Sequence, residues 1–290
     1  MFFSMQERFS ILQHNNNELK IRYLESNNGD VERRKHLVFI HGLGSSADRW
    51  LDIPDALSLY FHTIAIDLPG FGGSDKPSNM NYTIEAFSDI IRQFMDKNRI
   101  TKEDLDNNKA SKVTLVGHSL GGYIASKIAA DYDSNLIDKL VLIDSSGNLE
   151  RPTPVLQQYL DAAMNPSKEK VRKVFEQMVA NPLLISDVLV KGFIDRISNP
   201  NSKYAFESSM RNSANTQIGI KNLNRIGEKG ISTLIIWGTY DKVIPTEHSQ
   251  IFREAIKDSK AIIIPQTGHA PFTEKPALVC EYLHKFLACK

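Results

Sequence analysis

The sequence predicts an α/β protein with a mostly parallel, doubly wound sheet, an antiparallel N-terminal hairpin and an inserted helical segment. Short apolar runs recur along the chain without polar alternation, which is typical of strands buried on both faces of a parallel sheet. Segments with the apolar spacing of helices lie between these runs, as in right-handed βαβ units. The stretch at about 148–225 contains no such run, and this break in the pattern predicts the insertion.

The N-terminal hairpin is predicted from alternation. Residues 8–13 and 18–25 alternate apolar and polar side chains on either side of three consecutive asparagines at 15–17. This pattern is typical of two antiparallel strands joined by a turn, and we expect them to form one edge of the sheet.

Six continuous apolar runs predict the buried strands, at 37–40, 63–66, 113–116, 140–143, 234–237 and 261–264. Helical spacing predicts helices at 48–60, 83–98, 120–132, 247–257 and 275–288. The last of these has Pro276 in its first turn, a position that proline favours.

The insertion is divided by three Asn-Pro pairs at 165–166, 181–182 and 199–200. The residue before a proline disfavours helical backbone, so each pair predicts a helix boundary. Apolar residues recur at helical spacing between the pairs, and we expect four helices. The predicted organisation is a core of 1–147 and 226–290 with the insertion at 148–225.

Composition limits the function classes. Lysine and arginine number 35 and aspartate and glutamate 34, for a net charge of +1 without long blocks of one sign. This charge distribution argues against nucleic-acid or membrane partners and favours a small-molecule substrate. We expect the protein to be a monomer or a homodimer. The cysteines, Cys280 and Cys289, and the histidines lack zinc-site spacing. With no leader-like or membrane-spanning apolar run, we expect a cytoplasmic protein.

The candidate nucleophile is Ser119. It lies in the G-x-S-x-G motif at 117–121, directly after the apolar run at 113–116 and before a predicted helix. On a tight strand-to-helix turn a serine hydroxyl projects above the strand ends, and flanking glycines permit the close backbone approach. The strand–turn–helix context favours a catalytic serine over an ordinary turn serine.

A serine hydroxyl needs a base and a carboxylate that orients the base. Asp241 follows the run at 234–237, and His269 follows the run at 261–264. Both then lie at the carboxyl edge of the sheet, where open α/β sheets build their sites. Asp144, which ends the run at 140–143, is a rival acid, although it could equally be a turn residue.

These motifs, taken in order, resemble the α/β-hydrolase superfamily in the branch with a helical cap, and the match runs nearly end to end. The matching segments are His41-Gly42-Leu43-Gly44, Asp67-Leu68-Pro69-Gly70-Phe71-Gly72-Gly73-Ser74, Gly117-His118-Ser119-Leu120-Gly121, Asp241-Lys242-Val243-Ile244-Pro245 and Gly268-His269. The resemblance implies that Ser119 is the nucleophile, Asp241 the acid and His269 the base.

The resemblance also implies that the backbone N–H groups of Leu43 and Leu120 form the oxyanion hole, and that 148–225 is the cap. Within the cap, Tyr159, Phe175, Met178 and Tyr204 are candidates for substrate contact, but their helical spacing is equally that of a packed core. His41 and His118 are expected to support the site rather than to act as bases. No metal or organic cofactor is required by such chemistry.

The expected reaction is hydrolysis of small to medium carboxylic esters. Ser119 argues against the related epoxide hydrolases and haloalkane dehalogenases, which carry aspartate at that position. The related carbon–carbon hydrolases use the same triad, but they tend to carry H-G-G-G-P-G and a tryptophan after the histidine. This chain has 41–44 as His-Gly-Leu-Gly and Ala270 after His269. A lactonase, a carbon–carbon hydrolase and a non-catalytic small-ligand receptor of the same fold remain alternatives.

Overall fold

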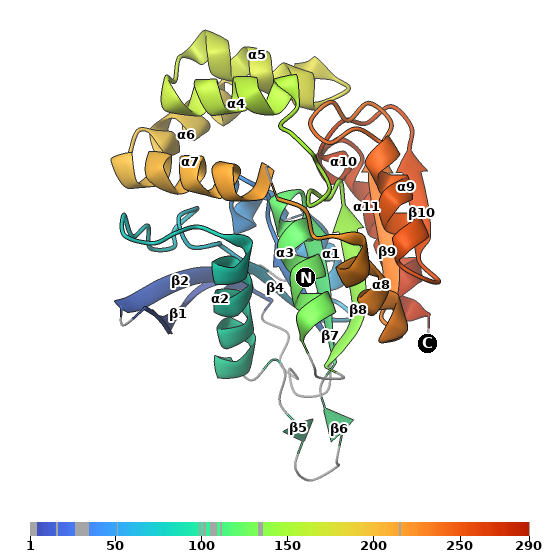
Figure 1. Ribbon diagram of the computed structural model, residues 1–290. Helices are drawn as coiled ribbons and strands as arrows, with labels where there is room; N and C mark the ends of the chain where they lie inside the picture. The colour runs from blue at the N-terminus through green and yellow to red at the C-terminus, as the bar shows by residue number, and fades with distance from the viewer. Residues whose placement is uncertain are drawn as a thin grey trace.

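The computed structural model describes residues 5–15, 17–26, 35–50, 52–98, 100, 103–104, 109–110, 112–132, 136–214 and 216–289. An eight-stranded sheet runs through it in the order β1-β2-β4-β3-β7-β8-β9-β10 (Figure 1). Its strands are β1 (Gln6–His14), β2 (Asn17–Glu25), β3 (His36–Ile40), β4 (His62–Ile66), β7 (Val113–His118), β8 (Ile137–Ile143), β9 (Ser232–Gly238) and β10 (Lys260–Ile264).

Strand direction confirms the predicted fold class. β1 pairs antiparallel with β2, and β2 pairs antiparallel with β4. From β4 to β10 every neighbouring pair is parallel. The parallel strands β3, β4 and β7 are almost entirely buried, which explains their continuous apolar sequence. A separate pair, β5 (Glu103–Asp104) and β6 (Lys109–Ala110), is antiparallel.

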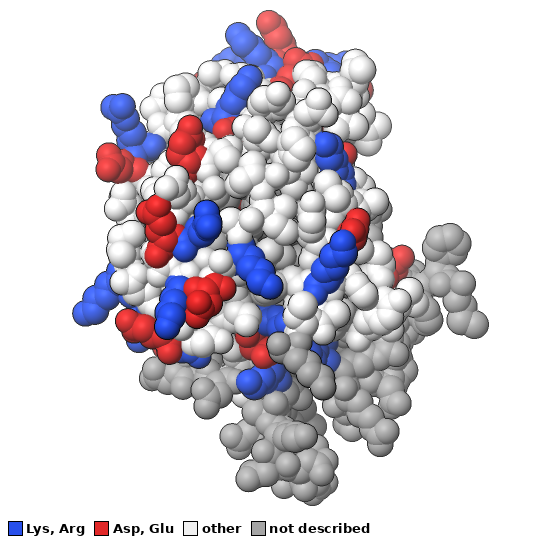
Figure 2. Space-filling view, turned by 90° about the vertical axis from the view of Figure 1, so that its right-hand side faces the viewer, with Lys and Arg blue, Asp and Glu red and all other residues white. Residues whose placement is uncertain are grey.

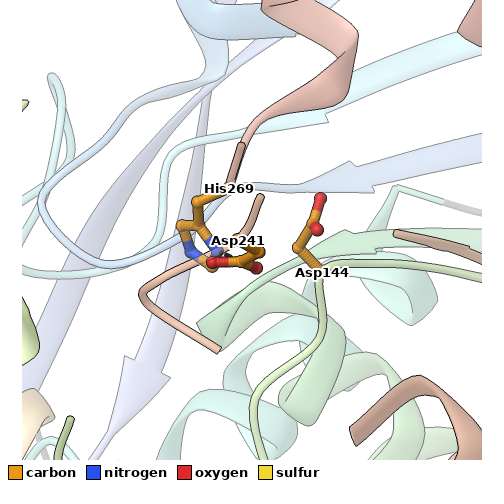
Figure 3. A group of neighbouring side chains, drawn as sticks. All are labelled: Asp144, Asp241 and His269. Atoms are coloured by element: carbon orange, nitrogen blue, oxygen red, sulfur yellow. Dashed lines mark hydrogen bonds and ion pairs between the residues drawn. The ribbon is translucent and has the colours of Figure 1, made fainter. Parts of the chain in front are cut away.

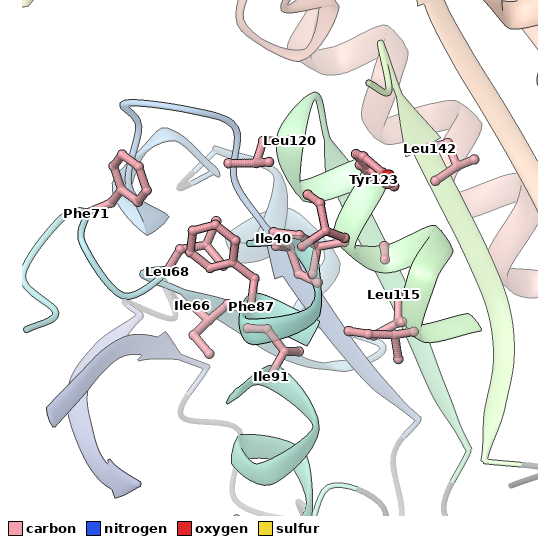
Figure 4. Close-up of a cluster of buried hydrophobic side chains, with 14 of the residues drawn as sticks. Ile40, Ile66, Leu68, Phe71, Phe87, Ile91, Leu115, Leu120, Tyr123 and Leu142 are labelled. Atoms are coloured by element: carbon pink, nitrogen blue, oxygen red, sulfur yellow. The ribbon is translucent and has the colours of Figure 1, made fainter. Parts of the chain in front are cut away.

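Helices cover both faces of the sheet. One side carries α2 (Ile84–Lys97), α3 (Leu120–Asp131), α8 (Ile220–Glu228) and α9 (Glu247–Ala255). The other carries α1 (Asp52–Leu57), the 3-10 helix η2 (Ala47–Trp50), α10 (Pro271–Glu274) and α11 (Pro276–Ala288). Each face therefore has its own apolar core. Figure 4 shows the first, where Phe87 and Ile91 of α2 pack near Ile40, Ile66 and Leu115 of the strands.

The segment between β8 and β9 contains the four expected helices, α4 (Pro154–Met164), α5 (Lys168–Met178), α6 (Asp187–Ile197) and α7 (Pro200–Ala214), with the 3-10 turn η3 (Pro182–Leu184). They pack on one another and lie over the ends of the strands (Figure 1). The boundary expected at 225 falls inside α8, which packs against α3 and α9 of the sheet layers. Its apolar residues Leu223 and Ile226 are buried there, so we assign α8 to the core.

Charge on the face drawn in Figure 2 is mixed, with Lys and Arg interspersed among Asp and Glu. Among the described residues, the helices include none with the length and apolar character needed to cross a membrane.

Candidate active site

Ser119 lies on the sharp turn between β7 and α3. Its φ of 52° is rare for a residue with a side chain, a kind of backbone strain that clusters at functional sites. Ser119 also occupies the N-cap position of α3, yet its side chain makes no capping hydrogen bond. A serine at this position ordinarily caps the helix. The hydroxyl is therefore left available for other contacts.

The glycines of the motif make this turn possible. A Cβ at Gly117 would lie 2.3 Å from the carbonyl oxygen of Gly121, and one at Gly121 would lie 2.1 Å from that of Ile40. Both distances are too short for real atoms, so the first turn of α3 packs on β7 and β3 only because side chains are absent there. This close approach is the physical reason for the sequence pattern around Ser119.

Asp241 and His269 form the hydrogen bond that the sequence suggests. His269 Nδ1 lies 2.8 Å from Asp241 Oδ2, and both residues are buried. Asp241 Oδ1 accepts hydrogen bonds from the N–H groups of Val243 and Ile244, which orients the carboxylate. In the tautomer in which Nδ1 donates to Asp241, Nε2 of His269 is an acceptor, and none of the described residues donates a hydrogen bond to it.

The backbone of His269 is held from two sides. Its N–H donates to the carbonyl of Met178 at the end of α5, at 2.7 Å. Its carbonyl accepts from His118 Nε2, also at 2.7 Å. Burial and the nearby His269 lower the pKa of His118 well below its ordinary value, so His118 is neutral and acts as a hydrogen-bond donor. The expectation that His118 supports the site is consistent with this geometry.

His41 is likewise a buried structural group. Its Nε2 accepts from the N–H of Leu68, which leaves Nδ1 to donate to the carbonyl of Gly42. Burial lowers its pKa, which favours the neutral ring that these two bonds require. Asp67, just before Leu68, accepts from the N–H groups of Ala47 and Gly73 and pairs with Arg22, so it fixes the loops beside the site.

Asp144 lies beside the Asp241–His269 pair but is oriented differently (Figure 3). One of its oxygens accepts from the N–H of Gly238, and the other has no hydrogen-bond partner among the described residues. Burial and the neighbouring Asp241 raise the pKa of Asp144 well above its ordinary value. Asp241 is therefore the carboxylate that forms the hydrogen bond with His269, and Asp144 is a buried neutral carboxyl group.

Asp144, Asp241 and His269 are also the residues that come nearest to a metal-ligand cluster, because their donor atoms lie within 4.8 Å of one another. Ligand atoms of a tetrahedral zinc ion sit about 2.0–2.1 Å from the metal and thus about 3.3 Å apart. The Nδ1–Oδ2 distance of 2.8 Å is instead that of a hydrogen bond. These residues fit an acid–base cluster better than a metal centre.

A cavity of about 130 Å³ opens onto Ser119 and His269. It is bounded by the 41–44 loop on one side and by α4, α5 and α6 on the other. Tyr159, Phe175 and Met178 line it, whereas Tyr204 instead packs against Tyr82 and donates to the carbonyl of Met80. Two further cavity residues, Arg49 and Arg196, carry no sequence signal, because only the folded chain brings η2 and α6 together.

Of the two backbone segments suggested for an oxyanion hole, one lines the cavity and the other lies next to Ser119. Leu43 lines the cavity, and Leu120 directly follows Ser119 as the first residue of α3. Within the described part of the chain, neither of these N–H groups donates a hydrogen bond to the protein. Tyr159 donates to the carbonyl of Leu43 at 3.3 Å, which ties α4 to this loop. Ser119 Oγ and the His269 ring form no hydrogen bond in the described structure. Catalytic hydrogen bonds of this kind are often long without substrate and shorten when substrate binds.

The sequence agrees with this fold and this arrangement of residues. Residues 35–276 match the alpha/beta hydrolase fold family, and the chain belongs to that family. Hydrolases are its relatives. It is 29% identical over 260 residues to Lipase 3 of Moraxella sp. (strain TA144), covering 88% of this chain and 77% of the lipase.

One further relative and one solved structure are also similar to this chain. The chain is 26% identical to the 2-hydroxy-6-oxo-6-(2'-aminophenyl)hexa-2,4-dienoic acid hydrolase of Metapseudomonas resinovorans, over 89% of this chain and 84% of that enzyme. A solved structure of a membrane phospholipase A is 25% identical with a TM-score of 0.81, covering 99% of this chain and 86% of that one. The family and its members support a hydrolase.

Proposed function

We propose that this protein is a serine hydrolase that cleaves carboxylic esters of small to medium size through an acyl-enzyme. One observation carries the proposal: His269 Nδ1 lies 2.8 Å from Asp241 Oδ2, and the His269 ring shares a cavity with Ser119. A serine with a base and an orienting carboxylate is the arrangement that activates a hydroxyl for attack on a carbonyl.

In this mechanism Ser119 Oγ attacks the ester carbonyl carbon while His269 Nε2 takes its proton. The tetrahedral intermediate collapses, the bond to the leaving oxygen breaks, and His269 returns the proton to that oxygen. A water molecule, deprotonated by His269, then attacks the acyl-enzyme. The bond between the acyl carbon and Ser119 Oγ breaks, His269 gives the proton back to Ser119 Oγ, and the acid is released. Asp241 keeps the Nδ1 proton in place and stabilises the imidazolium formed in each half-reaction.

Negative charge on the carbonyl oxygen needs donors that are already in position. The N–H groups of Leu43 and Leu120 are proposed for this role, since both lack protein partners in the described structure. Loss of one such donor in comparable sites costs about 2.7–4 kcal/mol of transition-state stabilisation.

Hydrolysis of a carbon–carbon bond is a second candidate reaction, because the same triad serves ester and carbon–carbon hydrolases and such a hydrolase is among the relatives. Two features support the ester instead. Leu43 and Ala270 both line the cavity at the positions where this chain departs from the carbon–carbon hydrolase pattern. A lactone is a cyclic ester and would follow the ester route. A small-ligand receptor would bind without repeated turnover.

Active-site labelling tests the nucleophile. After incubation with a fluorophosphonate, we expect one adduct on the peptide that contains Ser119, and none in Ser119→Ala. Ser45→Ala is the matched control, because Ser45 lines the same cavity and its loss leaves Ser119 in place. A label that persists in Ser119→Ala, or one that is lost in Ser45→Ala alone, would refute the assignment.

A further inference from the structure

The cavity above Ser119 carries positive charge without a carboxylate. Arg49 and Arg196 both line it, while none of its described lining residues is an aspartate or a glutamate. Arg49 comes from η2 on the core side, and Arg196 from the last turn of α6 on the cap side. An anion between them would therefore contact both layers of the protein at once.

Both guanidinium groups are available to a ligand. In the described part of the chain neither forms an ion pair or a side-chain hydrogen bond, because the carboxylates beside them in sequence are already engaged. Asp48 binds Arg22 at 3.0 Å, and Asp195 binds Lys191 at 2.5 Å. Both arginine side chains retain solvent-accessible surface, as a binding group that faces an open cavity must.

The two charges lie close enough to affect one another and the site. Burial of part of its surface, together with Arg196, lowers the pKa of the Arg49 guanidinium, although the residue as a whole remains exposed. Arg49 also contributes to the lowered pKa of His118, and Arg196 to that of His41. Two like charges in a partly enclosed space repel each other, and an anion bound between them relieves that repulsion.

We propose that Arg49 and Arg196 form a subsite for an anionic group of the substrate, a carboxylate or a phosphate. The remaining lining includes Leu156, Phe175, Ile185 and Leu189, so the favoured substrate is an ester with an apolar body and one anionic group. This inference rests on the proposed hydrolase function and names its substrate class. Guanidinium suits both anions, because it offers donors in a planar fork.

Matched esters test the proposal. We would compare kcat/KM for para-carboxyphenyl butyrate and para-phosphonooxyphenyl butyrate with that for the neutral para-carbamoylphenyl butyrate. For an anion on the acyl side, the mono-para-nitrophenyl ester of adipic acid is compared with its terminal amide. A charged hydrogen bond to either anion predicts a preference of about tenfold to a hundredfold for one anionic ester in the wild-type protein. The two aryl arms distinguish a carboxylate from a phosphate.

The variant Arg49→Gln/Arg196→Gln should reduce that ratio to near unity. Arg211→Gln is the control, because Arg211 is an exposed cap residue paired with Glu207 and changes charge without touching the cavity. Equal kcat/KM for anionic and neutral esters in the wild type would overturn the proposal, and so would an equal loss of preference in Arg211→Gln. The wild-type ratio decides the matter even if the double variant fails to fold.

A binding measurement separates this proposal from the hydrolase assignment. Calorimetry of wild-type protein with para-hydroxybenzoate, para-hydroxyphenyl phosphate and para-hydroxybenzamide, none of which has an ester, should show tighter binding of one anion. If esters are not cleaved but that anion still binds through the arginines, the hydrolase assignment fails and the subsite stands. If esters are cleaved while all three compounds bind equally, the subsite fails alone.

Discussion

The wholly buried carboxyl group of Asp144 lies within 4.8 Å of the carboxylate of Asp241, but only Asp241 is hydrogen-bonded to His269 (Figure 3). Two ionised carboxylates at this separation in a dry site would repel strongly, and the raised pKa of Asp144 avoids this by keeping one of them neutral. A neutral Asp144 leaves Asp241 as the charged acceptor that faces His269.

The first prediction separates the two acids. Asp241→Asn should reduce kcat/KM for ester hydrolysis by roughly 10³- to 10⁴-fold, because the amide no longer fixes the histidine tautomer. Asp144→Asn should lose less than about tenfold, because an amide is uncharged like the protonated carboxyl group and keeps an acceptor for the N–H of Gly238. Steady-state kinetics of the two variants measures this. The reverse order would make Asp144 the acid of the triad.

A second prediction concerns stability and pH. The folded-state pKa of Asp144 lies above its unfolded value, so the folded protein holds a proton that the unfolded chain releases. Stability is then lost as pH rises from about 4 toward the folded pKa, by at most about 1.4 kcal/mol per pH unit. Asp144→Asn removes this loss. The free energy of unfolding of the variant minus that of the wild type should therefore increase as pH rises from about 5 to about 8, as measured by denaturant titration.

Asp187→Asn provides the matched control for that experiment. Lys168 and Arg172 lower the pKa of the exposed Asp187, so its contribution changes only in acid and has the opposite sign. Between about pH 5 and about pH 8 its difference from wild type should stay constant. An Asp144→Asn difference that is equally flat would contradict a neutral Asp144.

A third prediction concerns the contact between cap and loop. Tyr159→Phe removes the hydroxyl that donates to the carbonyl of Leu43, and the Leu43 N–H should then be less well placed. We expect kcat to fall by about twofold to tenfold, the range of one weak neutral hydrogen bond. Tyr204→Phe loses a similar bond, to Met80, outside the cavity and should keep its kcat. Equal effects in the two variants would show that cap stability, not loop position, is responsible.

A fourth prediction concerns acid stability. His36 Nδ1 lies 2.7 Å from His62 Nδ1 at the start of β3 and β4, and burial lowers the pKa of His36 to about 4. The unfolded chain takes up a proton below about pH 6.5 and the folded protein does not, so up to about 3 kcal/mol of stability is lost as pH falls toward 4. His36→Asn should flatten this decline in urea titrations. An unchanged slope would assign the acid sensitivity to other groups.

Much of the fold could be predicted from the sequence, because parallel strands buried on both faces have continuous apolar sequences. β3, β4, β7, β8, β9 and β10 each include one predicted run. The burial expected for the last run is wrong, because β10 is the edge strand of the sheet and its Ala261 and Ile263 are exposed. The predicted end of the insertion at 225 falls inside α8, because no strand-like run precedes 234–237 to mark where the core resumes. α10 has only four residues, too few for a helical period to appear.

The candidate site was predictable to the extent that its residues are fixed to strand ends. Ser119, Asp241 and His269 follow β7, β9 and β10, so strand order alone brings them to one edge. Asp144 has the same kind of position, and only the direction of its carboxyl group separates it from Asp241. Arg49 and Arg196 could not be found this way, because their meeting depends on how the cap helices pack over the loops.

The central claim is that Ser119 is the nucleophile of an ester hydrolase, and one comparison tests it most directly. Wild-type protein and Ser119→Ala would be assayed in parallel on para-nitrophenyl esters and lactones with short to medium acyl chains. We predict repeated turnover by the wild type and a loss of roughly 10⁴-fold or more in the variant, with an unchanged thermal midpoint. Turnover that survives in Ser119→Ala, or a wild type that turns over no ester or lactone, would contradict it.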